Sequence, residues 1–182
     1  ADCEFNERAI AAMMRECAKQ QVGAVAFPEL CLTGYTCADL FRDSALLAGA
    51  EAALAKLMEE TKDLDLLAFI GLPVPHGAAL YNCAAAICKG KLLGVAAKSC
   101  IPNYSEFYEA RHFSPAPKGE EITLCGQTVP FGSDLVFRCT NIPELSVAAE
   151  ICEDLWVPCP PSQKLAMAGA TVVFNLSASD ET

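Results

Sequence analysis

Residues 80–98 read LYNCAAAICKGKLLGVAAK, which places two apolar runs on either side of a Lys-Gly turn. Apolar runs of this length, bounded by turn residues, predict the two strands of a hairpin over residues 80–88 and 92–98. A third apolar run, over residues 64–72, predicts a buried strand upstream of the hairpin. We therefore expect strands to dominate the middle of the chain.

Segments upstream of this hairpin alternate between helix-like and strand-like patterns. Apolar residues at helical spacing predict an amphipathic helix over residues 5–20, and residues 22–27 form a short apolar run typical of a buried strand. Asp43 is a typical N-cap residue, and it precedes an Ala- and Leu-rich segment that predicts a second helix to about Thr61. Further strands are expected downstream over residues 121–125, 128–131, 135–138, 145–151 and 171–176, with a helix over residues 162–169.

This order of elements predicts the fold class. Alternating helices and strands followed by hairpins favour an α/β structure of layers with mixed sheets, rather than a helix bundle or an all-β sandwich. The most loop-like stretches, residues 115–121 and 158–162, are too short to separate domains, so residues 1–182 are expected to form a single domain. Because the first predicted helix has no strand before it, we expect the sequence to be an excerpt of a larger domain.

The composition excludes several classes of protein. The chain is 53% hydrophobic, which excludes disorder, and its net charge of −10 without any Lys/Arg run excludes a nucleic-acid binder. No apolar stretch reaches the roughly 20 residues that span a bilayer, and no secretory leader opens the sequence, so a cytoplasmic protein is expected. The eleven cysteines are an odd set without a C-x-x-C pair, which argues against a disulfide framework and a structural zinc site.

Three residues with complementary chemistry each follow an apolar, strand-like run: Glu29, Lys98 and Cys152. Side chains at strand ends converge on pockets in layered α/β folds. A carboxylate placed there can accept a thiol proton, and an ammonium can stabilise both a thiolate and a developing oxyanion. Taken singly, each residue is equally compatible with a solvated surface side chain or, for the cysteine, with a small core residue.

The letters around these three residues carry a resemblance. Residues 27–35 (FPELCLTGY), 98–109 (KSCIPNYSEFYE) and 150–156 (EICEDLW) resemble the base, lysine and nucleophile segments of the nitrilase, or carbon–nitrogen hydrolase, superfamily. Their order and their separations of 69 (29 to 98) and 54 residues (98 to 152) also suit that superfamily. Together with residues 175–179 (NLSAS), they look most like the glutaminase domains of glutamine-dependent NAD⁺ synthetases, over about residues 5–179.

The resemblance implies a fold and a mechanism. The fold would be a nitrilase-like α-β-β-α four-layer sandwich with mixed sheets, truncated at both ends. Cys152 would attack the side-chain amide of glutamine, Glu29 would transfer the proton to the leaving ammonia, and Lys98 would stabilise the tetrahedral oxyanion. The resemblance also implies glutamine contacts from Tyr35, Tyr104, Glu153 and Ser179, and a supporting carboxylate, Glu106, as a buried partner that orients Lys98. Glu109 and His112, on the same segment as Glu106, are expected to be structural or interface residues.

Further expectations concern cofactors and partners. By the resemblance, residues 1–182 are one partial glutaminase domain that needs no cofactor or metal, whereas ATP and Mg²⁺ belong to a synthetase domain that is absent from this chain. Glutamine is the expected substrate and a homo-oligomer the expected assembly, with no nucleic acid or membrane as partner. Two alternatives remain open: a stand-alone nitrilase-type amidase that acts on another small amide, and a catalytically silent structural module.

Overall fold

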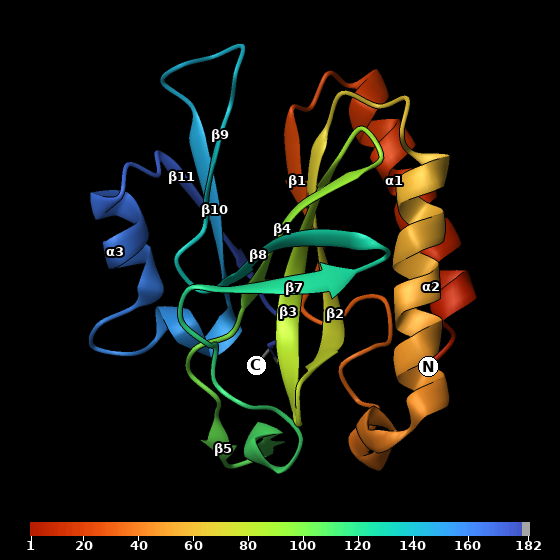
Figure 1. Ribbon diagram of the computed structural model, residues 1–182, viewed down its shortest axis with the longest axis vertical. Helices are drawn as coiled ribbons and strands as arrows, with labels where there is room; N and C mark the ends of the chain where they lie inside the picture. The colour runs from red at the N-terminus through yellow and green to blue at the C-terminus, as the bar shows by residue number, and fades with distance from the viewer. Residues whose placement is uncertain (180–182) are drawn as a thin grey trace.

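The computed structural model describes residues 1–179, which form four layers (Figure 1). Two long helices cover one face of a six-stranded sheet, a three-stranded sheet packs on its other face, and a short helix lies outside the second sheet. The helices are α1 (Cys3–Lys19), α2 (Ser44–Glu60) and α3 (Pro161–Met167). The large sheet contains β1 (Ala24–Ala26), β2 (Leu67–His76), β3 (Ala79–Cys88), β4 (Lys91–Ala97), β7 (Glu120–Leu124) and β8 (Gln127–Gly132).

The second sheet and the short elements complete the architecture. The second sheet has the order β11-β10-β9, and a two-stranded ribbon, β5 and β6, lies apart from both sheets. Three 3₁₀ turns, η1, η2 and η3, follow strands or precede helices. The bounds are β9 (Val136–Arg138), β10 (Ser146–Ile151), β11 (Val172–Leu176), β5 (Asn103–Tyr104), β6 (Phe107–Tyr108), η1 (Ala38–Arg42), η2 (Glu109–Arg111) and η3 (Cys152–Leu155).

Both sheets are mixed, as the sequence predicted. The large sheet has the order β1-β2-β3-β4-β8-β7, in which β1–β2 and β4–β8 are parallel and the other neighbours are antiparallel. In the second sheet, β10 is parallel to β11 and antiparallel to β9. Because β10 and β11 run side by side in the same direction, their carboxyl ends open at the same edge.

Local chemistry explains where the two long helices begin. The carboxylate of Asp2 accepts the N–H of Phe5 at 2.9 Å, and that of Asp43 accepts the N–H of Ala45 at 2.8 Å. Each aspartate thereby satisfies one of the N–H groups that a helix start leaves unpaired. The predicted capping role of Asp43 is confirmed.

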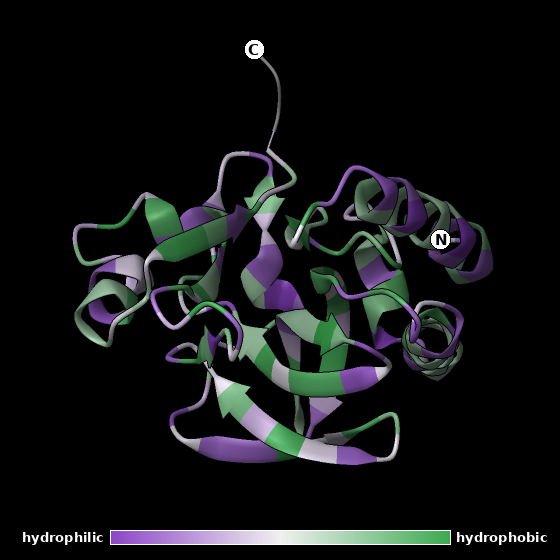
Figure 2. Cartoon of the chain, turned by 90° about the horizontal axis from the view of Figure 1, so that it is seen from above, coloured by the Kyte–Doolittle hydropathy of each residue, from purple (hydrophilic) through white to green (hydrophobic). Residues whose placement is uncertain are grey.

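Two apolar cores hold the layers together. One lies between the helices and the large sheet and includes Met14, Leu54 and Ile70; the other lies between the two sheets and includes Phe69 and Ile151. Figure 2 shows that the helices alternate hydrophilic and hydrophobic residues, as expected for helices that cover one face of a sheet. No helix in the described part of the chain is long and apolar enough to cross a membrane.

Strand β2 extends four residues beyond the predicted end at residue 72 and forms its own hairpin with β3. The added residues include Pro73 and Pro75. Strand β1 pairs with residues 67–69 of β2 and no farther. At the prolines, β2 therefore has β3 on one side and no paired strand on the other. Proline is tolerated at a sheet edge because no ladder hydrogen bond is lost there.

Candidate active site

A buried cluster of one ammonium and two carboxylates lies at the ends of strands of the large sheet. Glu29 follows β1, Lys98 follows β4, and Glu109 begins η2. The Nζ of Lys98 donates to Oε1 of Glu29 and to Oε1 of Glu109, each at 2.7 Å. The side chains of Lys98 and Glu29 are fully buried and that of Glu109 is 5% exposed, so this pairing takes place away from water. Buried charges persist only when they are paired in this way.

Burial and charge together perturb the protonation of this cluster. Burial raises the pKa of Glu29, the ammonium of Lys98 opposes the rise, and the charge of Glu109 adds to it. Burial disfavours the charged form of Lys98, but the two carboxylates outweigh that effect and its pKa is raised. The result is a lysine held as a cation beside a glutamate that is more basic than an exposed one.

The nucleophile candidate, Cys152, occupies the sharp turn at which β10 ends and η3 begins. Its side chain is buried, and its backbone has φ = 46°, in the left-handed region that non-glycine residues rarely adopt. Strain of this kind is tolerated where the surrounding structure imposes it, often at functional sites. The Sγ atom lies 3.3 Å from the Oγ of Ser177 and 3.6 Å from that of Ser179, and the amide of Asn175 donates to the Cys152 carbonyl at 3.3 Å.

The segment that follows β11 brings the cysteine and the charged cluster together. Ser177 contacts Sγ of Cys152, and the next residue, Ala178, donates its backbone N–H to Oε2 of Glu29 at 3.3 Å. Two consecutive residues therefore touch the thiol and the carboxylate. The structure thus links Cys152 to Glu29 through this short segment, and Glu29 in turn pairs with Lys98.

Asp154 ties the turn of Cys152 to the loop that carries Lys98. Its carboxylate is almost fully buried and accepts the backbone N–H groups of Ser99 at 3.0 Å, Cys100 at 2.8 Å and Ile151 at 3.1 Å. Burial raises the pKa of Asp154, and these three donors oppose the rise. Sequence reading missed this role because an aspartate next to Glu153 on a turn gives no sign of which one points inward.

The residues expected to contact glutamine surround this cluster. The hydroxyl of Tyr35 donates to Oε1 of Glu109 at 2.8 Å. Burial, and to a lesser extent this hydrogen bond, raises the pKa of Tyr35, so its hydroxyl keeps its proton and remains a donor. Tyr104 is 55% exposed and donates to Oε2 of Glu153 at 2.8 Å. Phe107 packs edge-on against both tyrosine rings, with centroid distances of 6.5 and 6.0 Å. Ser179, the fourth predicted residue, lies beside the thiol of Cys152 as described above.

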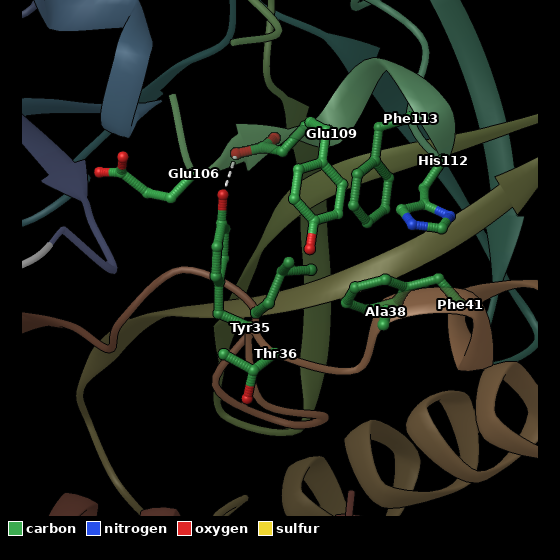
Figure 3. A pocket seen from close by; sticks show the side chains of 10 residues that line it. Tyr35, Thr36, Ala38, Phe41, Glu106, Glu109, His112 and Phe113 are labelled. Atoms are coloured by element: carbon green, nitrogen blue, oxygen red, sulfur yellow. Dashed lines mark hydrogen bonds between the residues drawn. The ribbon is translucent and has the colours of Figure 1, made fainter. Parts of the chain in front are cut away.

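The expectation for Glu106 is wrong, because the structure gives the position beside Lys98 to Glu109. Glu106 lies at the exposed tip of the β5–β6 ribbon, whereas the backbone N–H of Glu109 bonds to Pro102 at 3.1 Å and turns its side chain inward. Figure 3 shows the carboxylate of Glu109 directed at the hydroxyl of Tyr35 and that of Glu106 directed away from both. Two glutamates three residues apart cannot be distinguished from spacing alone, since the choice depends on how the ribbon folds back.

A cavity of about 160 Å³ adjoins Tyr35 and Glu109 (Figure 3). Its other walls include Phe41, Phe113 and His112, whose ring nitrogens are buried without a hydrogen-bond partner among residues 1–179. The expected structural role of His112 fits its packing against Phe41, with ring centroids 5.7 Å apart. In the part of the chain that the structure describes, no group of His, Cys, Asp and Glu side chains is arranged to hold a metal ion.

Comparison with known proteins places this site in a family. The glutamine-dependent NAD(+) synthetase of Mycobacterium tuberculosis is 41% identical over 183 aligned positions, which cover 100% of this chain and 27% of that protein. The crystal structure of a glutamine-dependent NAD(+) synthetase from Cytophaga hutchinsonii matches with a TM-score of 0.81 and 30% identity, over 98% of this chain and 28% of that one. The chain therefore spans somewhat over a quarter of the length of these relatives.

A more distant comparison concerns the fold alone. The NitN amidase from Nesterenkonia matches with a TM-score of 0.75 at 19% identity, over 100% of this chain and 64% of that one. The predicted nitrilase-like α/β fold with mixed sheets is thus confirmed. The sequence itself matches the carbon–nitrogen hydrolase family over residues 2–181, and the chain belongs to that family.

Proposed function

We propose that this chain is a glutaminase that releases ammonia from the side-chain amide of glutamine through a thioester on Cys152. The observation that carries the proposal is a pair of contacts made by two consecutive residues next to the buried Lys98: the hydroxyl of Ser177 with the thiol of Cys152, and the backbone N–H of Ala178 with the carboxylate of Glu29. The choice of glutamine is supported by relatives that are named glutamine-dependent NAD(+) synthetases and align with the whole chain.

The first half of the reaction forms the thioester. Glu29 accepts the thiol proton of Cys152 while Sγ attacks the amide carbon, and the resulting tetrahedral oxyanion is stabilised by Lys98 and by a backbone N–H after the nucleophile. An ammonium has three N–H donors, and two of those of Lys98 are directed at Glu29 and Glu109, which leaves the third for the oxyanion. The C–N bond then breaks as Glu29 returns the proton to the leaving nitrogen, which departs as ammonia. An oxyanion donor of this kind typically contributes about 3–4 kcal/mol.

The second half regenerates the thiol. A water molecule loses a proton to Glu29 and attacks the thioester carbon. The C–S bond then breaks as Glu29 returns that proton to the departing sulfur, which gives the thiol of Cys152 and glutamate, whose new carboxyl group ionises to solvent. The raised pKa of Glu29 suits both halves, because a carboxylate must accept and return a proton near neutral pH to act as base and acid. In this scheme Glu109 holds Lys98 and Tyr35 in place, while Tyr35, Tyr104, Glu153 and Ser179 bind the substrate.

We further propose that the ammonia serves a synthetase domain elsewhere in the encoded protein, which binds ATP and Mg²⁺ in the cytoplasm, and that the protein assembles as a homo-oligomer. The relatives' names and the share of their length that this chain covers support a partner domain of that kind. The eleven cysteines, all of which are free, fit a reducing compartment.

The test is glutamine hydrolysis by the protein in its full encoded length. Cys152→Ala is expected to abolish release of ammonia from glutamine, while synthesis from added free ammonia continues. Cys159→Ala is the matched control, because Cys159 is an exposed thiol seven residues downstream and should leave both activities unchanged. Loss of both activities in a folded Cys152→Ala protein would mean that the residue is structural.

Two further measurements decide between the proposal and its alternatives. Ammonia release from short aliphatic amides in preference to glutamine would identify an amidase of other specificity. One molecule of a glutamine-like electrophile should attach to each folded wild-type protein, seen as an increase in its intact mass, and none should attach to Cys152→Ala. A folded wild-type protein that forms no adduct and releases no ammonia would be a catalytically silent module.

A further inference from the structure

Asn82 of β3 lies inside the charged cluster, although nothing in the proposed reaction has so far used it. Its side chain is fully buried. Its amide nitrogen donates to Oε1 of Glu29 at 2.7 Å and to Oε2 of Glu109 at 3.4 Å, and its backbone carbonyl accepts the N–H of Lys98 at 2.9 Å. The assigned orientation of the amide is the favourable one, because the flipped form would place its oxygen against two carboxylates.

The two oxygens of Glu29 differ in their hydrogen bonding as a consequence. Oε1 accepts from both Lys98 and Asn82 at 2.7 Å, whereas Oε2 accepts only the more distant backbone N–H of Ala178, at 3.3 Å, among the described residues. Donors directed at a carboxylate oxygen lower its affinity for a proton. Oε2 is therefore the more basic oxygen, and it is the one beside the segment that contacts Cys152.

We propose that Asn82 is a positioning residue for Glu29, which fixes Oε1 toward Lys98 and so presents Oε2 to the thiol of Cys152. The inference deepens the proposed function and rests on it. Asn82 also donates to both Glu29 and Glu109, so it reduces the repulsion between these two carboxylates together with Lys98. Its Oδ1 atom is buried without a hydrogen-bond partner among residues 1–179, so the position is not explained by satisfaction of the asparagine itself.

The charges that face Glu29 determine the direction of the expected pH effect. Lys98 comes from the end of β4 and Glu109 from η2, and the hydroxyl of Tyr35 reaches the cluster through Glu109. The thiol of Cys152, at the start of η3, lies beyond the Ser177–Ala178 segment that contacts Glu29. Of the neutral donors, Asn82 opposes the rise in the pKa of Glu29 that burial causes. Removal of that donor therefore raises the pKa of Glu29 further.

The experiment compares Asn82→Leu and Asn82→Ser with wild type in the full-length protein. Leucine keeps the size and removes the donor, and serine keeps a shorter donor. Cys83→Ala is the matched control, since Cys83 is the next residue of β3 and is equally buried, but its side chain belongs to the core between the helices and the large sheet. Circular dichroism establishes folding, and two rates are then measured against pH: glutamine hydrolysis and alkylation of Cys152 by iodoacetamide.

For Asn82→Leu we expect kcat to fall by about 100-fold with KM little changed, as for a misplaced base. The acid limbs of both pH profiles should move to higher pH, with a smaller shift in Asn82→Ser and none in Cys83→Ala. Acid limbs that coincide with those of wild type in a folded Leu or Ser variant would overturn the inference, even where activity falls. If wild type does not hydrolyse glutamine, the proposed function fails, and the alkylation profile still decides the role of Asn82.

Discussion

The Nζ atom of Lys98 lies 2.7 Å from Oε1 of Glu109, no farther than it lies from Glu29. The lysine is thus shared between two carboxylates from different elements, in a region that excludes water. Glu109 also accepts the hydroxyl of Tyr35. The single buried carboxylate of Glu109 therefore positions both the ammonium of Lys98 and the ring of Tyr35, and its removal should displace both side chains.

Glu109→Gln is expected to lower kcat/KM for glutamine by at least about 100-fold, because misplacement of Lys98 by 1 Å is enough for such a loss. Since the charge of Glu109 raises the pKa of Glu29, its removal should also move the acid limb of the pH profile to lower pH. Glu106→Gln is the matched control, because this exposed glutamate has the same side chain three residues away. Equal losses in both variants would contradict the assignment.

The wild-type pH profile should reveal the buried base. Glu29 must be ionised to accept the thiol proton, and its pKa is raised above the usual 4.5 by burial. Activity is therefore expected to fall as the pH drops through the raised pKa, with the midpoint of the acid limb above 4.5. A profile of kcat/KM for glutamine measures that midpoint, and a midpoint at or below the ordinary value would exclude Glu29 as the base in its observed surroundings.

Asp154→Ala should destabilise the protein by more than a surface change does. The substitution leaves three backbone N–H groups without their acceptor, at roughly 1–3 kcal/mol for each one that stays buried and unpaired. Urea denaturation measures the change, and Asp63→Ala serves as the control because Asp63 is exposed and, within residues 1–179, forms an ion pair only with the surface residue Arg15. Similar stabilities of the two variants would show that water replaces Asp154 at no cost.

Gly71→Ala tests how closely β2 approaches the turn of Glu29. A Cβ atom on Gly71 would lie 2.4 Å from the carbonyl oxygen of Pro28 and 2.5 Å from the nitrogen of Leu30, so the turn must shift. We expect a loss of about 1–3 kcal/mol in stability and a larger proportional loss of glutamine hydrolysis. Gly23→Ala is the control, since a Cβ atom there meets nothing within 4 Å. Wild-type activity in Gly71→Ala would show that the turn can move without harm to Glu29.

His112 is expected to make stability depend on pH. Burial lowers its pKa below 6.5, although Asp39 opposes that effect, so the unfolded chain binds the proton more tightly than the folded one. The contribution of neutral His112 is present above pH 6.5 and is lost as the pH falls through the lowered value. In urea denaturation at several pH values, His112→Phe should flatten this part of the curve. An unchanged curve would assign the dependence to other groups.

Much of the fold could be predicted because local signals agree with the final structure. Helical spacing of apolar residues and a capping aspartate predicted α1 and α2 to within two residues. The Lys-Gly turn between two apolar runs predicted the β3–β4 hairpin, with bounds within one residue at each strand end. The continuation of β2 past residue 72 was not predicted; two prolines are tolerated there because β1 pairs only with residues 67–69, and the length of a neighbouring strand is not a local property of the sequence.

The sequence by itself determined the layered α/β fold, and it identified Glu29, Lys98 and Cys152 as candidate catalytic residues, since each follows a run of apolar letters and stands in a recognisable segment. Only the tertiary structure decided that Glu109 rather than Glu106 holds Lys98, and that Asn82 and Asp154 complete the site. The physical reason is that these choices depend on which side chains are buried together from strands and turns far apart in the chain. Burial determines which charges must be paired, and spacing along the sequence carries no record of it.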